Sequence, residues 1–197
     1  MFSLRPSFQE LKDVWLYGFA RSSLHEAIAC LDGVPSAASD TVTRALLSTT
    51  FIAYARPFSA WQVTSSERVV PLAKINPPPH LLQNHKDALA VRNKLIGHKD
   101  ATPGEGHSTT PNMILLHVTP THFDLHTTTI DSMDEPARMA LRELCMFFVD
   151  HCEAKLRRVT RIYHSEITSK DPGIYELVVA KPPDEWIRPF RPQSSAA

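Results

Sequence analysis

Residues 91–100 read VRNKLIGHKD, and the rest of the chain is best interpreted as a scaffold for this stretch. Arg92 and His98 stand six residues apart within it, and a polar residue, Asn93, directly follows the arginine. Arginine is well suited to bind phosphate through two donors, and histidine titrates near neutral pH. This stretch, whose residues 92–98 we call the motif, therefore offers a phosphate-binding cation together with a candidate acid or base.

The charge around the motif favours a polyanionic ligand. Between His80 and Lys99 there is one acid, Asp87, and the cations are Lys86, Arg92, Lys94 and Lys99. The whole chain has 21 basic and 21 acidic side chains. Affinity for a nucleic acid must therefore come from this local patch, because no general positive field surrounds the chain.

The same residues also have a purely structural interpretation. Arg92 can be a surface cation paired with Asp87 or Asp100, and the lysines can belong to a solvated helix face. His98 can stand at the C-terminal end of a helix, where the helix dipole favours a cation.

The composition is that of an ordinary globular chain. With 197 residues, of which 43% are hydrophobic and 21% charged, the chain suits a single domain with one sizeable core. Its three cysteines, at positions 30, 145 and 152, indicate reduced thiols rather than a disulfide framework. The first residues lack the apolar segment of a signal peptide, and no apolar run approaches bilayer length. We therefore expect a soluble, cytoplasmic protein without a membrane partner.

Two amphipathic helices are predicted before the motif. Ser7 and Glu10 form a capping-box pattern, and the apolar period that follows them continues to Gly33. A second helical pattern begins near Ser39 and should end before Pro57, because proline disfavours helical geometry in the residue before it. The two helices should form an antiparallel hairpin.

A third helix should carry the motif. Residues 56–79 show no sustained period, which predicts an ordered loop with a helical turn or two. Pro79 suits the first turn of the third helix. One face of this helix would hold Leu82, His85, Leu89, Arg92 and Ile96. Gly97 weakens the helix just before His98.

Residues 113–128 alternate in hydrophobicity and are rich in β-branched side chains, which predicts a hairpin of two short strands. A turn of two or four residues would align one face made of Ile114, Leu116, Val118, Phe123 and Leu125. The other face would hold His117, His122, Asp124 and His126. This spacing matches no metal motif, so we expect a polar exposed face and no metal site.

The remaining sequence predicts the longest helix and a tail. This helix should run from Ser132, with Glu135 and Pro136 as start signals, to about Ser165, and its apolar stripe extends from Ala137 to Ile162. Residues 171–197 are proline-rich and should lie along the surface or be partly disordered, with a short strand at 175–179. The expected fold is therefore mainly α, an antiparallel bundle of at least four helices with a small β-hairpin inserted before the last long helix. The helical domain would span residues 1–170, followed by the tail.

The string RNKLIGHKD resembles the Arg-x(4–6)-His motif of HEPN domains, the all-helical "higher eukaryotes and prokaryotes nucleotide-binding" superfamily. It is most similar to the prokaryotic abortive-infection-type members. The preceding helical hairpin and the segment RPF at residues 56–58 add to the resemblance, which covers roughly the first half of the chain and the long last helix. The hairpin at 113–128 and the tail lie outside it.

This resemblance implies a metal-independent endoribonuclease that needs no cofactor. By the resemblance, Arg92 would bind the scissile phosphate, His98 would act as base or acid at the ribose 2′-hydroxyl or the leaving oxygen, and Asn93 would orient one of them. The lysines that would bind RNA are Lys86, Lys94 and Lys99.

The resemblance also implies partners. They are single-stranded RNA, a second copy of the chain in a homodimer, and an antitoxin protein if the chain acts as a toxin or defence effector. In active members the Arg-His pairs of two protomers meet at the dimer interface. We expect the two motif helices to face each other, with some of Leu89, Leu95 and Ile96 at the contact. The alternatives are a monomer that uses all three leucine and isoleucine side chains in its own core, and a non-catalytic HEPN-like module that binds a nucleotide or a protein partner.

Overall fold

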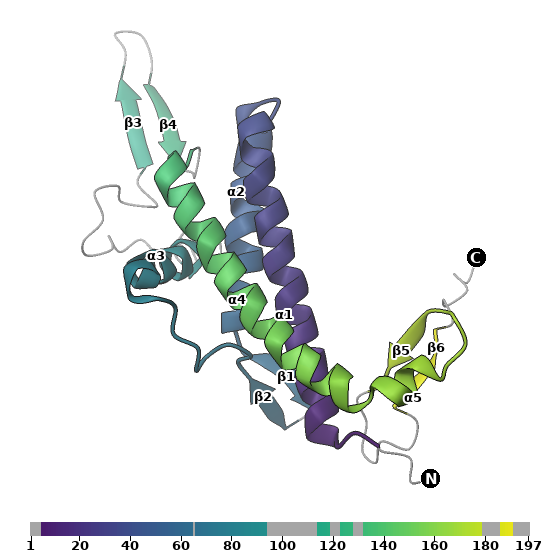
Figure 1. The fold of residues 1–197 in the computed structure, drawn as a ribbon. Coiled ribbons are helices and arrows are strands. Elements are labelled where there is room, and N and C mark those ends of the chain that lie inside the picture. Colours follow the sequence, from purple (N-terminus) through teal and green to yellow (C-terminus); the bar gives the residue numbers. More distant parts are fainter. Residues whose placement is uncertain are drawn as a thin grey trace.

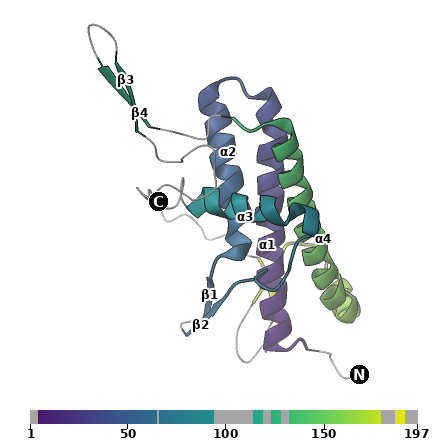
Figure 2. The same ribbon diagram turned by 90° about the vertical axis from the view of Figure 1, so that its left-hand side faces the viewer.

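The computed structural model describes residues 5–64, 66–93, 114–118, 123–127, 132–178 and 186–190. Within these ranges the protein is mainly helical, as predicted, and has three small two-stranded antiparallel sheets. The long helices lie side by side and are α1 (Phe8–Gly33), α2 (Asp40–Ala55) and α4 (Glu135–Ile162), as Figure 1 shows. The short α3 (Leu82–Val91) lies across them (Figure 2), so an antiparallel bundle of four helices is not confirmed.

Local capping explains where α1 and α2 begin, and the two helices form the predicted antiparallel hairpin. Ser7 and Glu10 make a reciprocal capping box: the Glu10 backbone N–H donates to Ser7 Oγ at 3.2 Å, and the Ser7 backbone N–H donates to Glu10 Oε2 at 2.8 Å. Ser39 Oγ accepts from the Val42 backbone N–H at 3.4 Å and caps α2. The α2 helix ends before Pro57, as the sequence predicts.

The segment between α2 and α3 contains a hairpin that the sequence does not predict. The expected helical turns are the 3₁₀ turns η2 (Arg56–Phe58) and η3 (Pro79–Leu81). Between them β1 (Trp61–Thr64) pairs with β2 (Glu67–Val69). Strands of four and three residues are too short to show a period of two in the sequence.

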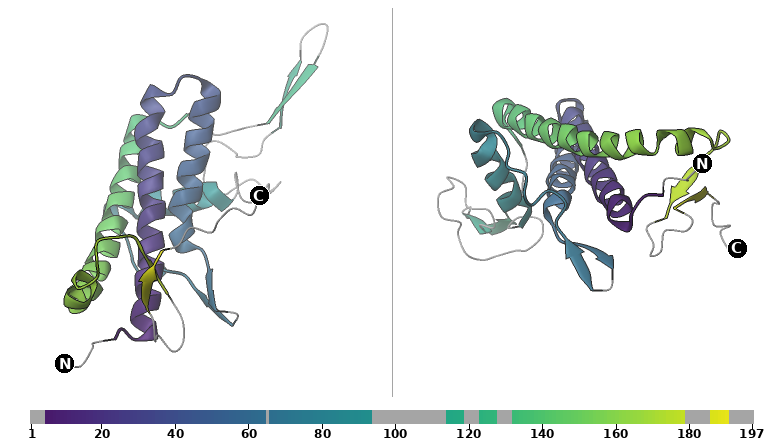
Figure 3. Two further views of the ribbon diagram at one scale, coloured as in Figure 1. Left: turned by 90° about the vertical axis from the view of Figure 1, so that its right-hand side faces the viewer. Right: turned by 60° about the horizontal axis from the view of Figure 1, so that its bottom comes forward.

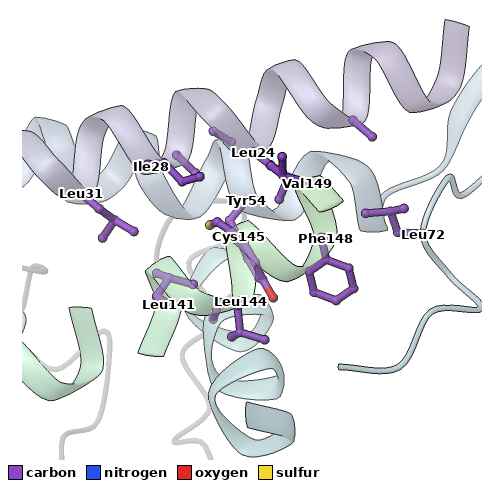
Figure 4. Close-up of a cluster of buried hydrophobic side chains, with 14 of the residues drawn as sticks. Leu24, Ile28, Leu31, Tyr54, Leu72, Leu141, Leu144, Cys145, Phe148 and Val149 are labelled. Carbon is purple, nitrogen blue, oxygen red and sulfur yellow. The ribbon is translucent and has the colours of Figure 1, made fainter. Parts of the chain in front are cut away.

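The main core lies between α1, α2 and α4, and Figure 4 shows side chains from all three helices meeting there. Its most deeply buried large side chains include Leu24, Leu31, Tyr54, Leu144 and Phe148. The predicted apolar stripe of α4 is buried from Leu141 to Cys152. Further along the helix the stripe leaves this core, and Ile162 is 42% exposed.

The last long helix is shorter than predicted at both ends. It begins after Asp134, whose Oδ1 accepts from the Ala137 backbone N–H at 2.8 Å, so Asp134 rather than Ser132 is the N-cap. The helix ends at Ile162, and after Tyr163 a separate short helix, α5 (His164–Thr168), follows. The apolar period continues across this break, which is why the sequence predicts one helix.

The tail is more ordered than predicted, within the part of it that the structure describes. The expected strand is β5 (Tyr175–Leu177), and it pairs with an unpredicted β6 (Ile187–Pro189). Trp186, just before β6, is buried with Leu11 of α1 and Tyr163, so the expectation of a surface-lying tail is wrong for this side chain. This second small core lies near the N-terminal end of α1 (Figure 3).

The predicted hairpin before α4 is present as β3 (Ile114–Val118) and β4 (Phe123–Thr127). Leu116 pairs with Leu125 and Val118 with Phe123, which is the register expected for the longer of the two turn lengths considered. His117 is opposite Asp124 on the alternate positions, while His122 lies outside the described residues. The hairpin projects away from the helices (Figures 1 and 3).

Candidate functional site

Arg92 and Asn93 stand at the C-terminal end of α3, where the backbone changes form. The backbone N–H of Arg92 donates to the carbonyl oxygens of both Ala88 and Leu89, and Arg92 and Asn93 themselves have π-helical backbone. π-Helical backbone is rare and frequently occurs at functional sites. The sequence predicts a regular helix at these two residues, so this change of backbone form is known only from the structure.

The side chains of Arg92 and Asn93 are bonded to each other. Arg92 Nη1 donates to Asn93 Oδ1 at 2.9 Å, with Arg92 half-buried and Asn93 exposed. A guanidinium group has five N–H donors, so one bond to Asn93 orients Arg92 and leaves it able to bind a phosphate oxygen. The bond therefore joins two of the expected site residues, Arg92 and Asn93, through their side chains.

The other expected site residues divide into two groups. His98, Lys94 and Lys99 lie outside the described residues. Lys86 is described, and it is exposed on α3, the same helix that ends at Arg92. A second group of basic side chains lies near the end of α4, far from α3 (Figure 1), so these side chains are not brought to Arg92: Lys155, Arg157, Arg158 and Arg161.

A cluster of four aromatic rings holds α3 against the rest of the protein, and no pattern in the sequence predicts it. We call these four residues the ring cluster: Tyr54 of α2, Phe58 of η2, His85 of α3 and Phe148 of α4. The ring centroids of Phe58 and His85 are 4.7 Å apart, and those of His85 and Phe148 are 5.7 Å apart. The one signal in the sequence is His85 itself, a titratable residue that lies between Leu82 and Leu89 on one face of the predicted third helix.

One hydrogen bond joins the polar atoms of this cluster. Tyr54 Oη and His85 Nδ1 are 2.7 Å apart, Tyr54 is fully buried and His85 is half-buried. Burial raises the pKa of the Tyr54 phenol and lowers the pKa of the His85 imidazole. Both shifts favour the neutral form of each side chain, which suits a hydrogen bond inside the protein.

A groove of about 570 Å³ lies between η3, the start of α3 and the first half of α4. Its lining includes His80, Leu81, Asn84, Met139, Glu143 and Met146. His80 Nε2 and Glu143 Oε1 are 3.0 Å apart, and Met139 and Met146 are 49% and 38% exposed. The groove therefore combines flexible apolar side chains with a few polar groups.

The thiols do not form a reactive site. All three cysteines are free, as the sequence predicts, and Cys145 and Cys152 are buried in the core. Burial raises the pKa of each of these two thiols to about 12. A thiol with so high a pKa is a poor nucleophile at neutral pH, so both cysteines serve packing.

No family model, curated protein or solved structure matches this chain. Among the residues that the structure describes, none of the helices combines the length and the apolar character needed to cross a bilayer.

Proposed function

We propose that this chain is a HEPN-like, metal-independent endoribonuclease, with Arg92, His98 and Asn93 as its catalytic residues. The observation that supports it most is the Arg92–Asn93 pair, in which an oriented guanidinium stands at a π-helical end of α3. The resemblance of the motif and the mainly helical fold agree with this proposal. The finer fold that we propose is the HEPN-type helical bundle, with α3 as its fourth helix.

The proposed reaction is transesterification at one RNA phosphate. His98 takes the proton of the ribose 2′-hydroxyl, the 2′-oxygen forms a bond to phosphorus, and the bond to the 5′-oxygen breaks. Arg92 stabilises the negative charge that grows on the phosphate oxygens. A protonated histidine returns a proton to the leaving 5′-oxygen, so the products are a 2′,3′-cyclic phosphate and a 5′-hydroxyl end.

Purified protein incubated with single-stranded RNA in EDTA tests this proposal. We expect cleavage products that end in a 2′,3′-cyclic phosphate, and we expect Arg92→Ala and His98→Ala to abolish them while the thermal midpoint stays nearly unchanged. Arg161→Ala is the matched control, because Arg161 is an exposed arginine at the far end of α4. Intact RNA with the wild-type protein, or loss of folding in the two motif variants, contradicts the proposal.

The second candidate is a non-catalytic module that binds a nucleotide or a protein partner, and the groove beside α3 favours it. Its volume of about 570 Å³ falls within the range of small-molecule sites. Calorimetric titration with nucleoside triphosphates distinguishes the two candidates. Binding that is lost in Met139→Glu, in a protein that leaves RNA intact, would favour the module over the nuclease.

A further inference from the structure

The α3 helix depends on a small number of contacts for its stability. It has only ten residues and no side-chain cap at its N-terminal end, and a helix so short is marginal in water without tertiary packing. Within the helix Ala88 is its only buried residue, and an alanine buries little apolar area. Leu89 and Val91 are partly buried against the core. The half-buried His85 ring must therefore supply a large share of the packing.

His85 contacts three other elements at once. Its ring lies against Phe58 of η2 and Phe148 of α4, and its Nδ1 atom is bonded to the Tyr54 hydroxyl of α2. His85 and Arg92 are seven residues apart, so they occupy nearly the same face of the helix, separated by about 10 Å along its axis. Any change in how His85 is held therefore moves the end of the helix that carries Arg92.

We propose that His85 is a positioning residue for Arg92, and that the Tyr54–His85 hydrogen bond makes the placement of α3 sensitive to protons. The part of this proposal that concerns Arg92 rests on the proposed nuclease function. The part that concerns α3 does not, because it follows from the contacts of His85 alone.

Protonation of His85 weakens its contacts for two physical reasons. The Tyr54 hydroxyl is a donor whose partner in the structure is Nδ1 of His85, and Nδ1 can accept from it when neutral His85 carries its own hydrogen on Nε2. An imidazolium has a hydrogen on both ring nitrogens, so protonation of this tautomer removes the acceptor of the buried hydroxyl. The added charge also sits among Phe58, Phe148 and the neutral phenol. Among the described residues of the elements packed against His85, the titratable group that faces the imidazole is the Tyr54 phenol. The Cys145 thiol of α4 lies near that phenol and is itself buried and neutral.

The direction of the pH effect follows from the lowered pKa of His85. Burial holds that pKa below its ordinary value of 6.5, so the protein with α3 released binds the proton more readily than the protein with α3 held. The stabilisation of α3 is therefore complete above pH 6.5. It decreases as the pH falls below that value towards the pKa of His85 in the folded protein.

Amide hydrogen exchange on the full chain tests the hydrogen bond. Tyr54→Phe removes the hydroxyl and keeps the ring, and we expect exchange of the α3 amides to accelerate about two- to tenfold relative to those of α1. Tyr17→Phe is the matched control, because Tyr17 packs on a different histidine, His151, with ring centroids 6.1 Å apart. Equal acceleration in all helices, or an equal effect of Tyr17→Phe on α3, overturns the proposal.

The same measurement from pH 7.5 to pH 5, corrected for intrinsic exchange rates, tests the proton sensitivity. We expect the α3 amides of the wild-type protein to lose protection selectively. In His85→Asn, which places a non-titrating amide near the Nδ1 position, this pH dependence should disappear. His151→Asn is the control, since burial also lowers the pKa of His151 but this residue lies on α4, and it should keep the wild-type response. An unchanged pH response in His85→Asn overturns the proposal.

RNA cleavage then separates this inference from the proposed function. If the wild-type protein cleaves RNA, we expect cleavage to decrease in Tyr54→Phe and to be higher in His85→Asn than in His85→Ala. Cleavage that is insensitive to all three changes refutes a positioning role for His85. If the wild-type protein leaves RNA intact, the nuclease proposal and the positioning of a catalytic Arg92 both fail, while hydrogen exchange still decides whether His85 holds α3.

Discussion

Asn93 is the expected site residue whose side-chain contact the structure describes most directly. The sequence alone indicates a polar neighbour of Arg92, whereas the structure gives a 2.9 Å bond from Arg92 Nη1 to Asn93 Oδ1. Because the Asn93 side chain is exposed, its contribution to the stability of the folded protein should be small. Its effect should therefore appear in catalysis rather than in stability.

Asn93→Ala should lower the rate of RNA cleavage by about three- to tenfold, because the guanidinium loses a hydrogen bond that orients it. The thermal midpoint should stay close to that of the wild-type protein. Gln83→Ala is the control, since Gln83 is another exposed amide on α3 and donates to Asp87 at 2.9 Å. An equal decrease in both variants would show that the effect is not specific to Arg92.

Among the helices, α1 contains a glycine that its fold does not require. A Cβ atom added to Gly18 would meet no atom within 4 Å, and Gly18 lies in the interior of the helix. Glycine in a helix interior is destabilising relative to alanine because its unfolded backbone is more flexible. A small gain in stability is thus available at this position.

Gly18→Ala should stabilise the protein by about 1 kcal/mol and raise the thermal midpoint by about 2–4 °C. Thermal unfolding followed by circular dichroism measures the change. Gly33→Ala is the control, since Gly33 is the last residue of α1 and its added Cβ would lie 3.4 Å from Leu46 Cδ1. A lower thermal midpoint in Gly18→Ala would contradict this prediction. It would show that atoms other than those around Gly18 in the structure contact this face of α1 in solution.

In the molecule as a whole, two separate clusters of buried side chains hold the described elements together. The second cluster joins Leu11 at the start of α1 to Tyr163 and Trp186, which are 152 and 175 residues further along the chain. Tyr163 Oη also donates to Glu10 Oε2 at 2.9 Å, next to the capping box of α1. The β5–β6 hairpin is thereby fixed to the helical part of the protein.

Trp186→Ala should destabilise the protein by about 3 kcal/mol or more, because the change leaves a cavity where the indole was buried. The Leu11 and Tyr163 side chains also lose their packing contacts with the indole. Denaturant unfolding measures this loss. Phe190→Ala should change stability little, since Phe190 is 52% exposed. An unchanged unfolding curve for Trp186→Ala would show that the hairpin does not contribute to the stability of the helices.

The homodimer remains a prediction for the assembled molecule. Leu89, one of the three side chains considered for the contact, is partly buried against the core of its own chain, whereas Leu95 and Ile96 lie outside the described residues. We expect light scattering at micromolar concentration to give a mass of about twice 22.1 kDa. A monomer mass would contradict the dimer and weaken the nuclease proposal.

Local sequence signals were sufficient to predict several elements. The capping box of Ser7 and Glu10, the cap at Ser39 and the stop before Pro57 predicted α1 and α2 closely. The alternation at 113–128 also predicted β3 and β4 and left two registers open, of which the structure has one. These signals work because capping and side-chain periodicity depend on residues close together in the chain.

Contacts between distant segments could be found only in the tertiary structure. Tyr54 and His85 are 31 residues apart, and nothing in either local sequence pairs them. The burial of Trp186, the crossing of α3 over the long helices and the π-helical backbone at Arg92 likewise have no local pattern. An apolar period indicates that a face will be buried, but which side chains cover it depends on the shapes of all the elements that pack together.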